Sequence, residues 1–392
     1  MRFFYVVFLF ALIDVLWWLA ADRLARRTAT PRRWRTIAGV TAGVAFVGLT
    51  LLLTARLLRL RVMIMPEVCV IATYLWHFII APVSLLVLTV AVVIWRRGPK
   101  TVQVVVEDMG LTARPALSRR DFLYGGLVSL PPLTAVAMTG QSRLNEEDLI
   151  RRDFDLPIAD LPPGLDGLTI AHVTDPHLGS FITDRKVQKI IDTVNGMDAD
   201  LVLQTGDLIN SSLGDLPDGI NLLRALRGRY GVYSCQGNHD CIEDRDVFEN
   251  DVRRAGVNFL FDESCVVPVR GGRVRLMGPR WWGSNEDVLA WSVNQIAPTS
   301  PDDALGVLLA HHPHAFDAAA AAGIPLTLAG HTHGGQIALS RDLGVGRLMY
   351  RYWSGVYTKN RSTAVVSNGT GNWFPLRINV PCEVLKLTLR RA

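Results

Sequence analysis

Residues 325–335 read PLTLAGHTHGG, a short apolar run that ends in two histidines between glycines. The same arrangement occurs four more times in the second half of the chain, where a β-rich apolar run leads into Asp, Asn or His. The other runs are 168–174, 200–205, 231–236 and 306–310, and they lead into Asp175-Pro176-His177, Gly206-Asp207, Gly237-Asn238-His239-Asp240 and His311. Because sites in α/β sheets form where the carboxyl ends of strands converge, we expect these side chains to lie together.

The segments between these runs predict helices. Residues 184–197 and 217–228 space their apolar residues as a helix does. Near-continuous apolar runs such as 200–205 suit strands that are covered on both faces. One Asp-x-His or Gly-Asn-His-Asp is common in loops, but five polar clusters, each at a strand end, predict one functional site in an α/β domain.

The chemistry of the clusters indicates metal ions. Their side chains are carboxylates, imidazoles and one carboxamide, which suit Mn, Fe or Zn, and they contain no cysteine of the kind that a closed structural zinc site uses. The set is too large for one ion. Two ions that share a carboxylate can lie about 3.5–4 Å apart, hold a bridging hydroxide and clamp a phosphoryl group for in-line attack. We therefore expect hydrolysis of a phosphate ester or anhydride.

Together these motifs resemble the calcineurin-like metallophosphoesterase family. The longer run 330–336, the run 367–371 and the sequence Pro375-Leu376-Arg377 are similar to its membrane-associated branch, the transmembrane proteins with a metallophosphoesterase domain. The resemblance covers residues 155–390. It implies a two-sheet α/β/β/α sandwich, which in this chain follows an α-helical transmembrane region.

The resemblance also implies a role for each residue. The ligands of the first ion would be Asp175, His177, Asp207 and His333, and those of the second would be Asp207, Asn238, His311 and His331, with Asp207 bridging. His239 would contact the phosphoryl oxygen or protonate the leaving group, with Asp240 orienting its ring. The alternative is that His239 binds metal.

Two further histidines, His312 and His314, compete with His311, and the family position favours His311. We interpret His172 as a core histidine. After the predicted strand at 272–278 the branch often carries acidic residues, whereas this chain has Pro279-Arg280-Trp281-Trp282-Gly283. Arg280 is a candidate for binding a substrate phosphate, and the tryptophans could stack on a base or cover a lipid. The alternative is a structural aromatic cluster.

The first third of the chain predicts membrane helices. It consists of apolar segments between arginine clusters, and a single helix needs about 20 residues to cross a bilayer. The candidate spans are residues 3–20, 37–55, 66–95 and 122–140. Pro66 and Pro82 interrupt the third, which we expect to be one long span rather than two short segments. Residues 1–97 would then hold about three spans, and residues 98–140 a basic linker with the fourth.

The fourth segment has two interpretations. The sequence Ser118-Arg119-Arg120-Asp121-Phe122-Leu123 resembles a twin-arginine export signal, with a cleavage-like pattern at 135–137, and the alternative is a plain transmembrane helix. Both place Arg119 and Arg120 in the cytoplasm and the catalytic domain of a multi-pass cell-membrane protein on the extracytoplasmic side. The arginines between residues 23 and 35 agree with this topology, whereas Arg56, Arg59 and Arg61 conflict with it.

Other features exclude some classes of protein. The net charge of +5 comes largely from arginines that flank apolar segments. The soluble part has no stripe of basic residues interleaved with aromatics, so the sequence does not indicate a nucleic-acid partner. No CxxC pair occurs among the five cysteines, for which unpaired thiols are the simpler interpretation. Asp14 and His77 lie inside apolar spans, where polar residues often mark function. The sequence identifies no partner for either.

These observations predict a metal-dependent phosphoesterase with membrane lipid and a phosphorylated small molecule or lipid as its partners. Relatives in the wider family cleave the pyrophosphate of a UDP-acylated glucosamine, so a lipid-linked substrate of that kind is one expectation. Such a substrate would need a cytoplasmic site, which the predicted topology disfavours. The rival hypothesis is a catalytically weak metal-binding sensor or scaffold at the membrane.

Overall fold

The computed structural model describes residues 2–28, 30–58, 65–96, 119–179, 181–298, 303–340 and 343–392. The chain forms two compact units, Met1–Gln141 and Ser142–Ala392, each of which has its own architecture. Most of the predicted basic linker, Ser118 of the twin-arginine motif, and Arg59 and Arg61 lie outside the described residues.

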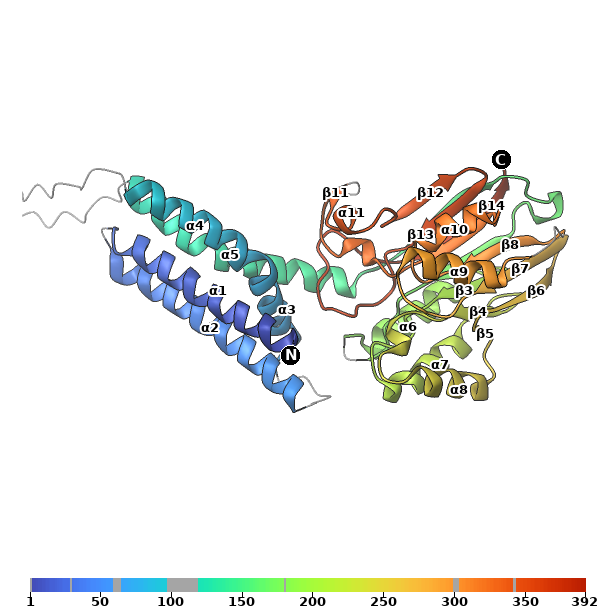
Figure 1. Ribbon diagram of the computed structural model, residues 1–392, viewed down its shortest axis with the longest axis horizontal. Coiled ribbons are helices and arrows are strands. Elements are labelled where there is room, and N and C mark those ends of the chain that lie inside the picture. Colours follow the sequence, from blue (N-terminus) through green and yellow to red (C-terminus); the bar gives the residue numbers. More distant parts are fainter. Residues whose placement is uncertain are drawn as a thin grey trace, which may run out of the picture. The chain divides into compact units, whose positions relative to one another are not determined.

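The first unit consists of long apolar helices (Figure 1). They are α1 (Arg2–Ala25), α2 (Pro31–Leu57), α3 (Glu67–Leu75), α4 (Ala81–Arg96) and α5 (Arg119–Glu147), which continues into the second unit. A π-helical turn, Trp76–Ile80, joins α3 to α4. Within the described residues, four helical stretches are long and apolar enough to cross a membrane: Tyr5–Ala25, Pro31–Ala55, Glu67–Ile94 and Phe122–Leu144.

The third stretch is one continuous helical run, as the sequence predicts. Proline in a helix lacks an N–H donor and clashes with the carbonyl four residues before it. Here the wide turn precedes Pro82 directly, and the Ala81 N–H bonds to the Trp76 carbonyl five residues back. The extra residue in this turn lets the chain continue past the proline.

Asp14 and His77, which have no evident partner in the sequence, are partners of each other. The Trp76 indole donates to Asp14 Oδ1 at 2.8 Å, and His77 Nε2 lies 3.0 Å from Asp14 Oδ2. His77 Nδ1 lies 2.7 Å from the Thr73 carbonyl oxygen, so this nitrogen carries a hydrogen. The pair fastens α1 to the π-helical turn.

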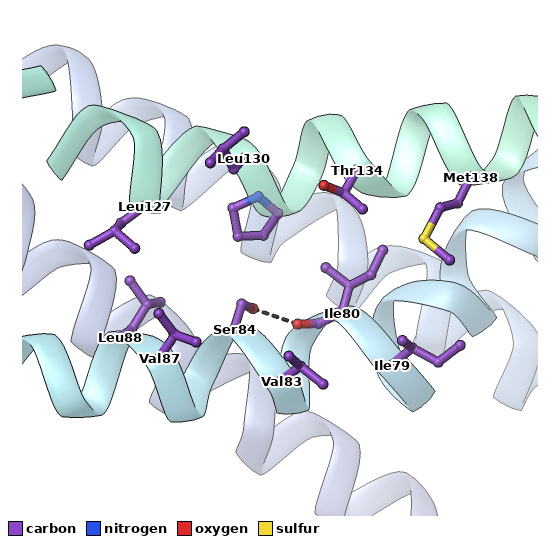
Figure 2. A pocket seen from close by; sticks show the side chains of 11 residues that line it. Ile79, Ile80, Val83, Ser84, Val87, Leu88, Leu127, Leu130, Thr134 and Met138 are labelled. Atoms are coloured by element: carbon purple, nitrogen blue, oxygen red, sulfur yellow. Dashed lines mark hydrogen bonds between the residues drawn. The ribbon is translucent and has the colours of Figure 1, made fainter. Parts of the chain in front are cut away.

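Helices α4 and α5 enclose an apolar cavity of about 330 Å³ (Figure 2). Its lining includes Val83, Leu88, Leu130 and Met138. The hydroxyl of Ser84, one of its few polar groups, already donates to the Ile80 carbonyl at 2.5 Å and accepts from the Trp17 indole. The cavity therefore offers mainly apolar contacts.

The second unit contains two six-stranded mixed sheets (Figure 1). The first has the order β1 (Leu149–Ile158), β14 (Cys382–Arg391), β2 (Thr169–Val173), β3 (Leu201–Thr205), β4 (Val232–Cys235) and β5 (Phe259–Leu260). The second has the order β12 (Gly355–Lys359), β13 (Ser362–Val366), β9 (Leu326–Ala329), β8 (Leu305–Leu309), β7 (Gly272–Gly278) and β6 (Glu263–Val269). A small pair, β10 (Ala338–Ser340) and β11 (Leu343–Gly344), precedes the short helix α11 (Gly346–Met349).

Helices cover the outer face of each sheet, which confirms the predicted α/β/β/α sandwich. Alternate residues of β3 face opposite sides: Leu203 lies in the core between the sheets with Leu328, whereas Val202 packs in a second core with helix residues. The helices on the first sheet are α6 (Asp184–Asn195), α7 (Leu216–Ala225) and α8 (Arg245–Ala255). Those on the second sheet are α9 (Glu286–Ile296) and α10 (Ala315–Ala321).

Most of residues 141–152 lie in a helix and a strand. Helix α5 ends at Glu147, and β1 begins at Leu149, before the predicted domain start at residue 155. β1 pairs in parallel with the last strand, β14, so the two ends of the second unit lie in one sheet. The exposed side chains of Arg151, Asp153 and Asp155 alternate with more buried ones, as expected of an edge strand.

Candidate metal centre

The strand ends deliver the predicted ligands to one place. Strands β2, β3 and β4 run parallel, as do β7, β8 and β9, so their carboxyl ends lie on one side of each sheet. The residues that follow these ends are Asp175 and His177 after β2, Asp207 after β3, Asn238 after β4, His311 after β8, and His331 and His333 after β9. The predicted convergence is thus a property of the fold.

The backbone is strained at five of these positions. Asp175, His177, Asp207, His331 and His333 have φ between 48° and 68°, the left-handed region that side chains rarely adopt. Such strain persists only where the surrounding structure imposes it, and it clusters at functional sites. Here neighbouring strand ends hold the turns, because the Asp175 N–H donates to the Gly206 carbonyl and the His177 N–H to the Asp207 carbonyl, each at 3.1 Å.

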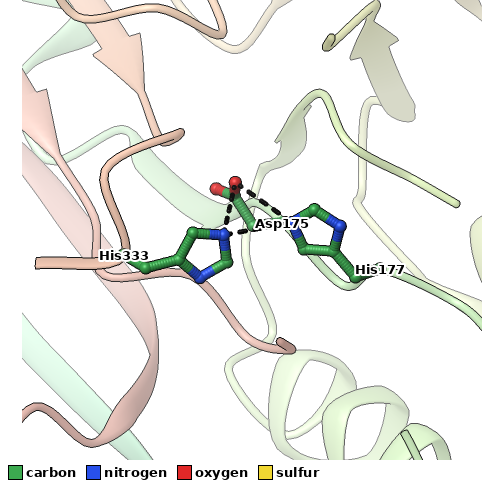
Figure 3. A group of neighbouring side chains, drawn as sticks. All are labelled: Asp175, His177 and His333. Atoms are coloured by element: carbon green, nitrogen blue, oxygen red, sulfur yellow. Dashed lines mark hydrogen bonds and ion pairs between the residues drawn. The ribbon is translucent and has the colours of Figure 1, made fainter. Parts of the chain in front are cut away.

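The first group comprises Asp175, His177 and His333, and all three are buried (Figure 3). Figure 3 shows both imidazole rings turning a nitrogen toward the Asp175 carboxylate. Asp175 Oδ1 lies 3.3 Å from His333 Nε2 and 3.7 Å from His177 Nε2. The two ring nitrogens are only 3.0 Å apart.

The second group comprises Asp207, His311 and His331, with Asn238 beside them. Asp207 Oδ2 lies 3.1 Å from His311 Nε2. Asn238 Oδ1 lies 3.0 Å from the same nitrogen and 2.8 Å from His331 Nδ1. Asp207 Oδ2 is also 3.5 Å from His177 Nε2. This carboxylate therefore stands between the two groups, where a bridging ligand belongs.

These donor atoms fit a pair of divalent cations. His311 Nδ1 lies 2.8 Å from the Thr205 carbonyl oxygen, so Nδ1 carries a hydrogen and a neutral ring turns the Nε2 lone pair toward Asp207 and Asn238. Nitrogen and oxygen lone pairs then converge, which requires a positive charge between them. Burial lowers the pKa of His311, but the adjacent Asp207 carboxylate outweighs burial and raises it to about 9. A proton thus supplies that charge, and a metal ion would replace it.

The other groups are ready to act as ligands. Burial lowers the pKa of His331 to about 3 and that of His333 to about 4, so both rings are neutral. Burial opposes ionisation of Asp175 and Asp207, yet the neighbouring histidines, first His333 for Asp175 and His311 for Asp207, hold both carboxyl pKa values below the ordinary range. Neutral imidazoles with two carboxylates are the donor set that Mn, Fe or Zn accepts.

His239 lies at the edge of the two groups. Its Nδ1–H donates to the Asn210 carbonyl oxygen, so Nε2 is free, and its ring packs edge-on against His177 with centroids 4.6 Å apart. Burial lowers the pKa of His239. A ring nitrogen also lies close enough to His177 and Asp207 to share a cation with them. The geometry of His239 fits both roles, acid–base group and metal ligand.

Asp240 does not orient His239, contrary to the prediction from the family resemblance. Its Oδ2 accepts from the Gly237 N–H at 2.9 Å and its Oδ1 from the Ile209 N–H at 3.1 Å. Because His239 and Asp240 are consecutive in a tight 3₁₀ turn, their side chains point to different sides, and the Asn210 carbonyl holds the ring instead. Burial, and then Asp207, raise the pKa of Asp240 to about 7.

The competing histidines occupy distinct places. His311 joins the second group, whereas His312 packs its ring against His331 at 4.6 Å between centroids. Burial lowers the pKa of His312. His172 is fully buried with Nε2 2.9 Å from Thr205 Oγ1, as expected of a core histidine.

Arg280 is held by carboxylates, so the structure does not support it as a phosphate ligand. Its Nε and one terminal nitrogen each bond to Glu249 at 2.9 Å, and its backbone N–H donates to Asp262 at 2.8 Å. The following Trp281 instead forms a wall of the site, with its ring 5.8 Å from those of His311 and His331. Sequence reasoning could not detect the ion pairs because Glu249 is 31 residues away in the chain.

Arg377 is a site residue whose role the sequence did not reveal. Its fully buried guanidinium lies 2.8 Å from His333 Nδ1 and donates to the carbonyls of Asn368 at 2.9 Å and Gly371 at 2.7 Å. It thereby ties a metal-site histidine to the loop before β14. The only sequence signal was its place in the Pro-Leu-Arg motif, which shows no contact.

Aromatic rings complete the walls. Tyr350 lies 5.7 Å from His331 and Trp373 lies 6.0 Å from His239, measured between ring centroids. Neither stood out in the sequence, since each becomes adjacent to the histidines only through loops outside the five motifs.

Residues 168–335 match the sequence profile of the calcineurin-like phosphoesterases. That span contains every ligand candidate, from Asp175 to His333. Over this span the second unit is therefore similar to the calcineurin-like phosphoesterase domain.

The chain is also similar to individual metallophosphoesterases. The chain is 30% identical over 258 residues to a transmembrane protein with metallophosphoesterase domain from Danio rerio, a match that covers 61% of this chain and 57% of that protein. It is 28% identical over 291 residues to an uncharacterized metallophosphoesterase of Bacillus subtilis, which covers 70% of this chain and 98% of that protein. It thus spans little more than half of the first relative and nearly all of the second. A solved dimetal phosphatase from Danio rerio aligns with 52% of this chain and 88% of that chain, with 10% identity and a TM-score of 0.30.

Proposed function

We propose that this membrane protein hydrolyses a phosphoester or pyrophosphate bond at a two-metal centre. The observation that carries the proposal is the pair of donor groups that meet at Asp207. One divalent ion would be held by Asp175, His177, Asp207 and His333, and the other by Asp207, Asn238, His311 and His331. When bound, such a pair supplies an activated water and positive charge for the phosphoryl oxygens.

His239 would protonate the leaving oxygen. The Asn210 carbonyl fixes the hydrogen on Nδ1 and leaves Nε2 to carry the second proton. Transfer of that proton turns the departing alkoxide or phosphate into a stable product and returns a neutral imidazole. The Trp281 and Tyr350 rings lie beside His331, where they would limit water and so strengthen the electrostatic interactions of the metal centre.

The attachment to membrane helices favours a lipid-linked substrate. A phosphate or pyrophosphate whose organic group remains in the bilayer would be held near a site on the same chain. A UDP-acylated glucosamine is one such compound, but it requires a cytoplasmic site. Our proposed multi-pass topology, with Arg119 and Arg120 inside and the domain outside, favours an extracytoplasmic phospholipid or lipid pyrophosphate. A reporter fused after residue 145 that is active only in the cytoplasm would reverse this choice.

The test uses the full-length protein in detergent, loaded with manganese and given bis-p-nitrophenyl phosphate and p-nitrophenyl phosphate. We expect metal-dependent hydrolysis that falls by about 10²–10⁴-fold in His239→Ala and is lost in Asp207→Asn. The matched controls are His314→Ala and Asp218→Asn, whose side chains lie outside the donor groups. If the protein binds two ions per chain but hydrolyses neither these esters nor lipid pyrophosphates, the result would favour the rival hypothesis of a metal-binding sensor or scaffold. A folded protein that binds no metal would refute the proposal.

A further inference from the structure

An exposed apolar loop lies beside the metal centre. In residues 343–349, four side chains are open to solvent: Leu343 (54%), Val345 (40%), Leu348 (87%) and Met349 (64%). Leu348 is more exposed than any other large apolar side chain of the described residues, including those on the candidate membrane helices. Single exposed apolar residues are ordinary, but four within seven residues form a patch that marks an interaction surface.

The loop is built to hold this shape. A Cβ on Gly344 or Gly346 would lie 2.9 Å or 2.7 Å from the Trp353 ring, so both glycines let the indole pack on the backbone. The Val345 N–H donates to the Ile337 carbonyl at 2.9 Å. The apolar side chains are thus presented outward on a fixed backbone, although burying them would lower the free energy.

The same loop is joined to the metal ligands. Gly335 comes two residues after His333, and a Cβ there would lie 2.1 Å from the Gly346 nitrogen. At the end of the loop, the Tyr350 ring contacts that of His331 at 5.7 Å between centroids. A surface that covers the loop would therefore lie close to His331 and His333.

The chain itself indicates what covers the patch. Ser142, the first residue of the second unit, lies within the fourth candidate span, Phe122–Leu144. Its buried hydroxyl accepts from the Arg377 N–H at 2.8 Å, and the Arg377 guanidinium reaches His333. Thus a membrane-span residue is hydrogen-bonded to the segment that supports the metal centre.

The segment that contains Arg377 is also hydrogen-bonded to residues 336–338, which precede the apolar loop. The Ile378 N–H donates to the Gln336 carbonyl at 2.8 Å, and the Ala338 N–H donates to the Ile378 carbonyl at 3.0 Å. The apolar loop and the end of the fourth candidate span are therefore linked through residues 335–338 and 377–378. Exposed Arg347 and the half-exposed Trp373 suit the headgroup region, where arginine and tryptophan accumulate.

We propose that residues 343–349 insert into the bilayer interface and hold the metal centre at the lipid surface. Leu348 and Met349 would enter the acyl boundary, and Arg347 would remain with the phosphates. A lipid substrate could then reach the metal centre without leaving the membrane. The docking itself does not depend on the proposed hydrolysis.

The test uses the full-length protein in phosphatidylcholine–phosphatidylglycerol nanodiscs that contain a fluorescent phospholipid. The photoreactive residue p-benzoylphenylalanine replaces Leu348 or, as the matched control, Val266, an exposed residue of edge strand β6. After irradiation we expect about tenfold more lipid adduct at position 348 than at position 266, because only the former enters the acyl region. Equal adduct at both positions would overturn the proposal. A cross-linked protein dimer at position 348 would also overturn it, because the patch would then bind a second copy of the chain.

A second variant separates docking from folding. With the probe at position 343, Leu348→Asp combined with Met349→Asp should abolish most of the adduct, because charge disfavours insertion. The thermal midpoint and metal content should match those of the probe-only protein. Undiminished adduct in a folded variant would contradict the proposed anchoring residues. Neither readout uses catalysis, so failure of the phosphoesterase proposal would be seen separately.

Discussion

Gly330→Ala should disable the metal centre by adding one methyl group. Gly330 separates β9 from His331, and its φ lies outside the left-handed region, so alanine is compatible with its backbone. The added Cβ would lie 2.1 Å from Asp175 Oδ2 and 2.2 Å from Thr174 Oγ1, whereas ordinary contacts begin at 3.4 Å. The perturbation is therefore steric and falls on a predicted metal ligand.

The size of the effect follows from how far Asp175 must move. Its carboxylate has to shift by about 1.3 Å, and displacements of about 1 Å in an active site cost on the order of 10²-fold in rate. Overpacking should also lower the free energy of unfolding by about 1–3 kcal/mol. The shift would break the 2.7 Å hydrogen bond from Thr174 to Asp175.

The assay compares kcat on bis-p-nitrophenyl phosphate with metal content by mass spectrometry, for the full-length protein in detergent. The matched control is Gly306→Ala in the neighbouring strand β8, where the new Cβ would lie 3.3 Å from Pro325 and 3.4 Å from the flexible end of Met277. We expect kcat of the control within about threefold of wild type. Wild-type kcat with two ions bound in Gly330→Ala would refute the role of Asp175, and an equal loss in Gly306→Ala would show that the sheet tolerates no added methyl.

Three other changes test separate contacts. Arg377→Lys should lower the unfolding free energy by about 2–4 kcal/mol and metal affinity by about 10–100-fold, because one ammonium cannot replace the guanidinium at His333 and two carbonyls. Thermal unfolding measures the first effect and metal titration the second. Unchanged metal affinity would contradict the inference that Arg377 supports His333. Asp240→Asn should destabilise the domain by about 1–3 kcal/mol, since one carbonyl oxygen cannot accept both buried N–H groups; denaturant unfolding checks this, and full stability would exclude both bonds. In the membrane unit, a double-mutant cycle of Asp14→Leu and His77→Leu should give an interaction free energy of about 0.6–2 kcal/mol by thermal unfolding in detergent. If the two losses of unfolding free energy simply add, the pair does not fasten α1.

The sequence alone predicted an α/β domain with polar clusters at its strand ends, whereas the two-sheet sandwich was implied by the family resemblance. Strands 201–205 and 326–329 could be predicted because burial on both faces leaves a local apolar pattern. Parallel strands place the residues that follow them at one edge of their sheet, which predicts that Asp175 and Asp207 lie together. The meeting of Asp207 with His331 depends on how the two sheets pack. The long apolar segments predicted membrane helices for the same reason, since length and hydropathy are local properties.

Only the tertiary structure decided which atoms face one another. Asp240 points away from His239 because a tight turn separates their side chains, and Arg280 is taken by Glu249 from a distant helix. The partners Asp14 and His77 are 63 residues apart, and the contact of Arg377 with His333 spans 44. Such pairings depend on long-range packing and on the direction of each side chain, which no local periodicity records.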